Sequence, residues 1–165
     1  MLSILKKGLL VGVCIIAYFF GIRELRQEMH DAYMGTIFPE TYGQINDDYS
    51  YLSVSSVSFT IYTIDDTQPK AWQFRMPFDS YWLFGTLGLI LLGARKENYV
   101  ALIAIHLTTG LLNVLFVIIG LIGYDFLLIS VDFICRYLIP LASLGYVSIV
   151  FGQHQRAKKV NVYTS

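Results

Sequence analysis

The residues best suited to chemistry lie in the stretch VDFICRYLIP, residues 131–140. Within this apolar run stand an acid, Asp132, a thiol, Cys135, and a base, Arg136. Asp132 and Arg136 are four positions apart, the helical spacing that brings opposite charges together. A histidine, His106, lies in the preceding apolar block. A cysteine activated by a nearby histidine is a nucleophile, so these residue types suggest a thiol-dependent enzyme, provided that the helices bring them within hydrogen-bond reach.

Composition indicates that a membrane surrounds these residues. Of the 165 residues, 55% are hydrophobic and 15% are charged, and the mean hydropathy is +0.56. A soluble domain has about 45–50% apolar and about 25% charged residues. The formal net charge is zero, which argues against nucleic acid as a partner. We therefore expect one integral membrane domain, with the lipid bilayer as its immediate surroundings.

Four apolar blocks are candidate membrane spans, since a crossing helix needs about 20 mostly apolar residues. They cover about 5–24, 78–94, 99–123 and 126–152, and the first is expected to be an uncleaved anchor because small residues are missing where a signal peptidase would cut. Basic residues gather before the first block, between the second and third, and in the tail. The positive-inside rule then predicts cytoplasmic N- and C-termini, with the long loop 25–77 outside.

The long loop is predicted to hold a small sheet. Its beginning continues the first helix as far as a C-cap at Gly35, and 39–43 reads as a turn. Residues 49–64 are rich in strand-forming types but change alternation phase at Ser55–Ser56, which implies a bulge or a break, and 71–76 offers a return strand. The predicted fold class is a mainly α four-transmembrane-helix bundle with a small extracytoplasmic antiparallel β element between helices 1 and 2.

Two further features of the loop suggest ligands, but each has a simpler interpretation. Its aromatic residues suit either a sugar or peptide platform or, as we favour, packing at the membrane interface. The acidic pairs lack the alternating spacing of a calcium loop and are interpreted as solvated turns. No metal site and no cofactor are predicted. The residues concerned are Tyr49, Tyr51, Tyr62 and Trp72, and the pairs Asp47–Asp48 and Asp65–Asp66.

Depth in the bundle decides which polar residues can meet. The third block carries a polar and small-residue stripe that includes His106 and Asn113. A tight turn at Tyr124–Asp125 puts Arg136 level with Asn113, whereas His106 lies about 12 Å deeper. The predicted intramembrane polar cluster is therefore Asp132, Arg136 and Asn113, with His106 and Cys135 as secondary candidates and no catalytic residue. Helix packing is expected at Gly85, Gly88, Gly110 and Gly120, and a kink at Pro140.

Three roles remain open for the charged pair. The two residues could neutralise each other within the bundle. They could instead pair with a polar group of another membrane protein, or line an ion path. We favour the first, and the lack of an inverted repeat argues against a transporter acting alone.

The last span resembles a known group of proteins. The stretch CRYLIPLASLGYVSIVF, within residues 132–151, is similar to the final helix of small exosortase-associated membrane proteins of Bacteroidota, in which Arg-Tyr-Leu precedes a hydrophobic stretch with small residues. The resemblance implies a non-catalytic inner-membrane partner of the machinery that sorts and processes surface proteins. The expected function is thus an accessory or assembly subunit of a bacterial inner-membrane complex, bound to another integral membrane protein. The alternatives are a small oligomeric ion or solute channel and, third, a membrane-embedded thiol enzyme.

Overall fold

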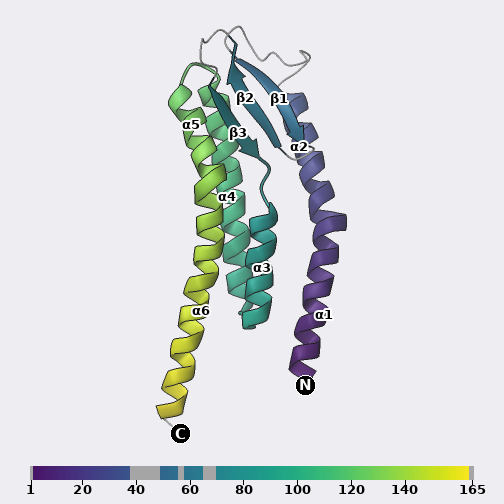
Figure 1. Ribbon diagram of the computed structural model, residues 1–165, viewed down its shortest axis with the longest axis vertical. Coiled ribbons are helices and arrows are strands. Elements are labelled where there is room, and N and C mark those ends of the chain that lie inside the picture. The colour runs from purple at the N-terminus through teal and green to yellow at the C-terminus, as the bar shows by residue number, and fades with distance from the viewer. Residues whose placement is uncertain (1, 38–48, 56–57, 65–69, 164–165) are drawn as a thin grey trace.

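The computed structural model describes residues 2–37, 49–55, 58–64 and 70–163. The predicted turn at 39–43 and both acidic pairs of the long loop lie outside the described residues. The chain is mostly helical, with a small three-stranded antiparallel sheet. Figure 1 shows long helical rods running side by side and the sheet at the end away from both termini.

The helical elements are α1 (Leu2–Ala17), the π-helical turn η1 (Tyr18–Ile22), α2 (Arg23–Ile37), α3 (Ser80–Leu92), α4 (Lys96–Gly120), α5 (Asp125–Phe133), the π-helical turn η2 (Ile134–Leu138) and α6 (Ile139–Tyr163). The strands are β1 (Tyr49–Ser55), β2 (Ser58–Thr63) and β3 (Ala71–Arg75). In Figure 1, α1 and α2 form one continuous rod, and α5 and α6 form another.

Three helical stretches are long and apolar enough to cross a membrane: Ile4–Ala32, Lys96–Gly120 and Asp125–Arg156. The second predicted span, 78–94, corresponds to α3, an apolar helix of only 13 residues, or about 20 Å at the helical rise. The predicted C-cap at Gly35 is wrong, because α2 continues to Ile37. Glycine permits the left-handed cap conformation but does not impose it.

The sheet has the strand order β1-β2-β3, and both strand pairs are antiparallel. The phase change seen in the sequence marks the end of β1 at Ser55, next to a register shift between Ser53 and Ser55. One face of the sheet packs on α4 and α5 in a shared core with Tyr49, Trp72, Val117 and Leu128.

Two of the sheet's buried aromatic residues, Tyr49 and Trp72, pack inside the protein. The rings of Tyr49 and Trp72 are 6.3 Å apart, and only 5% and 6% of their surfaces are exposed. The Tyr49 hydroxyl donates to the carboxylate of Asp125, which also lies 3.9 Å from the Lys70 ammonium. These side chains therefore join the sheet to the start of α5 and do not form an exposed ligand platform. The side chain of Tyr51 lies outside the described residues.

The chain turns from β3 into α3 at Phe78, whose φ of 58° lies in the left-handed region. Asp79 caps α3, since its carboxylate accepts hydrogen bonds from the backbone N–H groups of Tyr81 and Trp82 at 3.0 and 3.4 Å. The helix ends at Gly93, which adopts the left-handed conformation (φ 66°) of a glycine C-cap. Local sequence therefore sets both ends of α3.

Four glycines lie where neighbouring segments approach closely. A Cβ atom at Gly85 would lie 3.0 Å from Leu102, and one at Gly88 would lie 2.8 Å from Val147. The corresponding distances are 3.1 Å from Gly110 to Pro77 and 2.7 Å from Gly120 to Leu128. Small residues allow helices to pack this closely, so these positions hold α3, α4, α5 and α6 together.

Candidate functional site

His106 forms a buried polar contact between α4 and α6. Its Nε2 atom is 2.9 Å from the Ser143 hydroxyl, which itself donates to the Ile139 carbonyl at 2.8 Å. Because a hydroxyl has one hydrogen to donate, Nε2 of His106 is the donor in its contact with Ser143. The imidazole also stacks on the Phe78 ring, with ring centroids 5.9 Å apart. His106 is thus held as a packing residue between three segments.

Asn113 and Cys135 form the second buried contact, between α4 and η2. The Asn113 amide donates to Cys135 Sγ at 3.3 Å, and neither residue is exposed. Among the described residues, Asn113 forms no hydrogen bond with Asp132 or Arg136, so the three residues of the predicted cluster are not joined by hydrogen bonds. His106 and Cys135 also have separate partners, as their difference in depth suggested.

Asp132 and Arg136 form the predicted charged pair, with Arg136 Nε 2.8 Å from Asp132 Oδ1. The same oxygen accepts the backbone N–H of Gln73 in β3, also at 2.8 Å. The Asp132 side chain is 22% exposed and that of Arg136 is 48% exposed. The pair therefore attaches the sheet to the helices at the surface of the bundle.

The π-helical turn η2 explains part of this arrangement. Pro140 has no N–H, so the Arg136 carbonyl lacks its usual helical donor. The N–H of Ile139 bonds to the carbonyl of Ile134, five residues back, which is the π-helical pattern. The buried face runs through Val131, Cys135 and Ile139, one position away from the Asp132–Arg136 row. Hence Cys135, and neither charged residue, faces Asn113.

A second polar region, which was not anticipated from the sequence, lies where η1, α2, the sheet and the start of α3 meet. Arg26 is only 7% exposed, and its guanidinium donates to the Met76 carbonyl at 3.3 Å and to the Tyr18 hydroxyl at 3.4 Å. A polar cleft of about 270 Å³ adjoins it and is also lined by Tyr18, Ser58, Gln73, Arg75, Asp79 and Ser80. The Arg23–Arg26 spacing after the first apolar block and the capping Asp79 were the available sequence signals.

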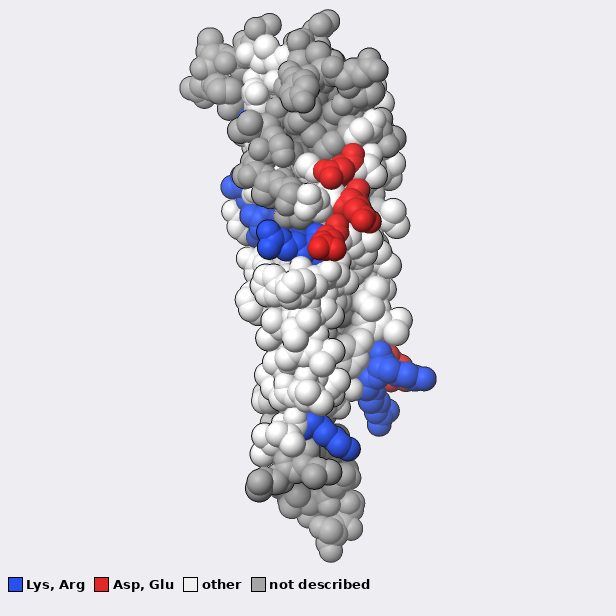
Figure 2. Space-filling model, turned by 90° about the vertical axis from the view of Figure 1, so that its right-hand side faces the viewer, with Lys and Arg blue, Asp and Glu red and all other residues white. Residues whose placement is uncertain are grey.

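Charged side chains gather at two levels on the α1–α2 side of the molecule. Figure 2 shows basic and acidic side chains next to each other in an upper band, an uncharged belt below it, and more basic side chains below the belt. On α1 the uncharged belt is Gly8–Ile22, between Lys7 and Arg23. In the part of the chain that is described, no group of three or more His, Cys, Asp and Glu side chains is placed to hold a metal ion.

The comparisons give this chain no relative from which a function could be transferred. Neither models of protein families, nor curated proteins, nor solved structures match it.

Proposed function

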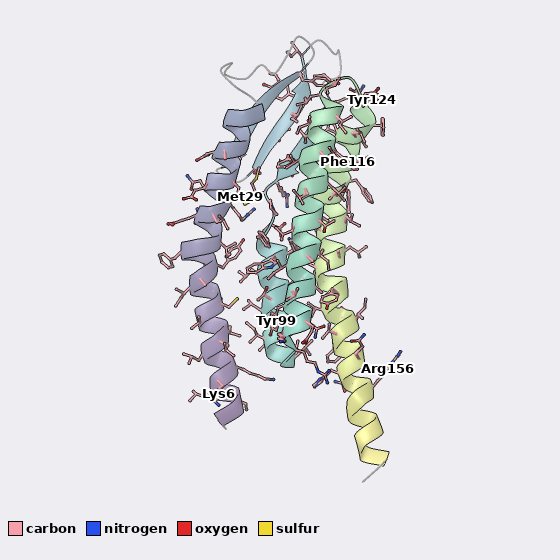
Figure 3. All side chains as sticks on the ribbon, turned by 180° about the vertical axis from the view of Figure 1, so that it is seen from behind. Lys6, Met29, Tyr99, Phe116, Tyr124 and Arg156 are labelled. Carbon is pink, nitrogen blue, oxygen red and sulfur yellow. The ribbon has the colours of Figure 1, made fainter. Side chains whose placement is uncertain are left out.

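We propose that the protein is a non-catalytic accessory subunit embedded in a bacterial inner membrane, with its N- and C-termini on the cytoplasmic side. Three long apolar helices support the embedding. Basic residues at one end of the bundle support the orientation, by the positive-inside rule. Figure 3 shows Lys6 and Arg156 at that end, and Lys7, Arg95 and Lys96 flank the starts of the helices α1 and α4.

The observation that carries the proposal is a mismatch in apolar length between two parts of the bundle. The uncharged part of the first rod, Gly8–Ile22 in α1 and η1, has 15 residues and α3 has 13, which correspond to about 22 and 20 Å. The helix α4 has 25 residues, or about 37 Å. Pro77, just before α3, packs at Gly110 of α4. From that level α4 continues ten residues toward the sheet, to Gly120, so this part of α4 extends beyond α3.

Beyond the level of Gly110, both α4 and α5 present exposed apolar rows. The side chains in these rows are 42–75% exposed. A bilayer deep enough to surround them would also immerse the charges of Arg23, Arg26 and Asp79, which is costly. A second membrane protein would cover the rows without that cost. The rows consist of Leu111, Leu115, Ile118 and Ile122 after Gly110, and of Phe126, Ile129 and Phe133 on α5.

The motif behind the family resemblance lies beside these rows. Arg136, Tyr137 and Leu138 are exposed, whereas Cys135 and Ile139 on either side are buried. The Arg136 guanidinium uses Nε for Asp132 and leaves its terminal nitrogens for a carboxylate or carbonyl group of a partner. Arginine and aromatic residues are common at the centres of interfaces. In keeping with the resemblance, we propose that the partner is an exosortase-type integral membrane protein.

The alternative functions receive less support. An ion path using Asn113, Asp132 and Arg136 would need the three to share a cavity, but Asn113 is fully buried against Cys135. A thiol enzyme would need a base beside Cys135, and the nearest histidine is engaged with Ser143. We therefore retain the accessory subunit as the proposal.

Site-specific photo-crosslinking in the host membrane tests this proposal. We expect a photoreactive amino acid at Phe133 to form an adduct with one integral membrane protein, which mass spectrometry of the adduct identifies. The same group at Leu144, an exposed α6 position about three turns from Phe133, should react mainly with lipid. The Arg136→Gln substitution keeps a hydrogen-bonding group for Asp132 and should reduce the protein adduct about tenfold or more.

The proposed function is wrong if the Phe133 position reacts only with lipid, as the Leu144 position does. A protein adduct that persists unchanged in Arg136→Gln would keep the accessory role but exclude Arg136 from the interface. Capture of a partner outside the exosortase type would overturn the proposed partner.

A further inference from the structure

An apolar groove lies between α1, with the π-helical turn η1 that follows it, and α3. The helices touch near one end, where the Lys7 ammonium donates to the Leu91 carbonyl at 2.7 Å. They touch again near the other end, where the rings of Tyr18 and Trp82 stack 6.2 Å apart. The groove has a volume of about 510 Å³, and its apolar walls include Ile15, Phe19, Leu83, Phe84 and Leu87.

The upper end of this groove is cationic. Arg23, Arg26 and Ser80 line it there, and no acidic side chain is among its lining residues. Tyr18, Arg26 and Ser80 also line the polar cleft described above, so the groove and the cleft share one wall. An apolar channel that ends at two arginines matches an amphiphile with a negatively charged head.

Arg26 supplies independent evidence for an anion-binding site. It is more than nine-tenths buried, and within the described chain its Nε atom has no hydrogen-bond partner. Asp79, the carboxylate in the cleft, is engaged in capping α3. No carboxylate of the described residues lies within ion-pair distance of Arg26. Asp79 attracts Arg26 from beyond ion-pair distance, whereas Arg75 repels it. A buried charge that is only partly compensated is costly, and a bound anion would reduce that cost.

We propose that the groove and cleft bind a glycerophospholipid with an anionic head group. The acyl chain lies between α1 and α3, and the phosphate lies at Arg23 and Arg26, where guanidinium groups form charge-assisted hydrogen bonds to its oxygens. The inference rests on the embedding part of the proposed function, because only a membrane protein meets such a lipid at this surface. It does not depend on the partner at the α4 and α5 rows.

Fluorescence quenching of Trp82 tests the site directly. The chain has two tryptophans, so Trp72→Phe leaves Trp82, beside the groove, as the only reporter. The protein is reconstituted in phosphatidylcholine vesicles that contain either phosphatidylglycerol or phosphatidylcholine with brominated acyl chains. We expect the brominated phosphatidylglycerol to quench Trp82 at a lower mole fraction than the brominated phosphatidylcholine.

Arginine substitutions connect the quenching to the proposed contact. Arg26→Gln should raise the mole fraction of brominated phosphatidylglycerol needed for half-maximal quenching about fivefold, the effect of one basic residue near an anionic lipid surface. Arg23→Gln, at an exposed residue, should act in the same direction and keeps the result decisive if Arg26→Gln does not fold. Arg95→Gln, an exposed arginine beyond the lower end of α3, serves as the matched control and should change nothing.

Each alternative outcome overturns a specific statement. Equal quenching by both brominated lipids, or quenching unchanged in Arg23→Gln and Arg26→Gln, overturns the lipid site and leaves the embedding intact. Loss of the preference when inorganic phosphate is added would show a site for a free anion, and the lipid proposal would fail. No quenching by either lipid would contradict the embedding itself.

Discussion

The two sides of the bundle differ in how they are held. In the spans Lys96–Gly120 and Asp125–Arg156, 33% of the most apolar window is buried inside the protein, whereas in Ile4–Ala32 only 6% is buried. The α4–α6 side packs through glycines, buried leucines and the sheet. The α1 side is held by polar and aromatic contacts at its two ends. Rigid packing and an open, ligand-accepting surface thus occupy opposite sides of one small protein.

This difference follows from the residues available on each side. Gly110 and Gly120 allow close approach on α4, and the small and polar residues of α4 form one buried row. On α1 a Cβ atom at Gly8 or Gly12 would meet nothing within 4 Å. Apolar side chains alone give no preference for a neighbouring helix over lipid, so α1 remains close to the bundle mainly through Lys7, Tyr18 and Arg26.

The largest expected effect lies in the tightly packed side. Leu128 of α5 is fully buried in the core shared with the sheet, so Leu128→Ala should lower the free energy of unfolding by about 2–5 kcal/mol. The matched substitution on the open side, Ile16→Ala at a residue that is 60% exposed, should change it by less than about 0.5 kcal/mol. Denaturant titration in mild detergent measures both. Equal losses would contradict the contrast between the two sides.

A smaller effect is expected where the sheet is attached. Asp132→Ala removes the acceptor for the Gln73 N–H and the partner of Arg136, at a cost of about 1–3 kcal/mol. Hydrogen exchange of residues 71–75 should become faster. Asp132→Asn retains an oxygen acceptor and should restore most of the protection at Gln73. If Asp132→Ala leaves the exchange of β3 unchanged, the pair does not hold the sheet.

The smallest effect is expected at the lower contact of α1. Lys7→Met keeps the length of the side chain but removes the hydrogen bond to the Leu91 carbonyl, worth about 0.5–1.5 kcal/mol. Spin labels at Ile4 and Val100, both exposed, should show a broader distance distribution. Lys6→Met is the control, since Lys6 has no hydrogen bond within the described part of the chain. Identical distributions for both variants would mean that Lys7 does not position α1.

Periodicity predicted the buried face of α4 well, because residues three or four positions apart lie on the same face of a helix. His106, Asn113, Val117 and Gly120 all lie on that face. The hydrogen bond of Asn113 to Cys135 was not predicted. Depth along the helix was correct, but the η2 turn and the burial of Cys135 changed which side chain points inward, and single-sequence spacing does not encode that rotation.

The polar cleft at Arg26 also could not be predicted from the sequence. Arg23, Arg26, Arg75 and Asp79 come from three segments, and no local pattern states that these segments converge.

Hydropathy and strand-forming composition were sufficient to specify long apolar helices and a small antiparallel sheet in the long loop, because these properties depend on neighbours within a few residues. Tertiary packing determined that Asp132 binds β3, that Cys135 meets Asn113, that α1 leaves a groove against α3 and that Arg26 is buried without an ion-pair contact among the described residues. Such contacts depend on helix rotation and on segments far apart in the chain, and small differences in packing energy decide among them.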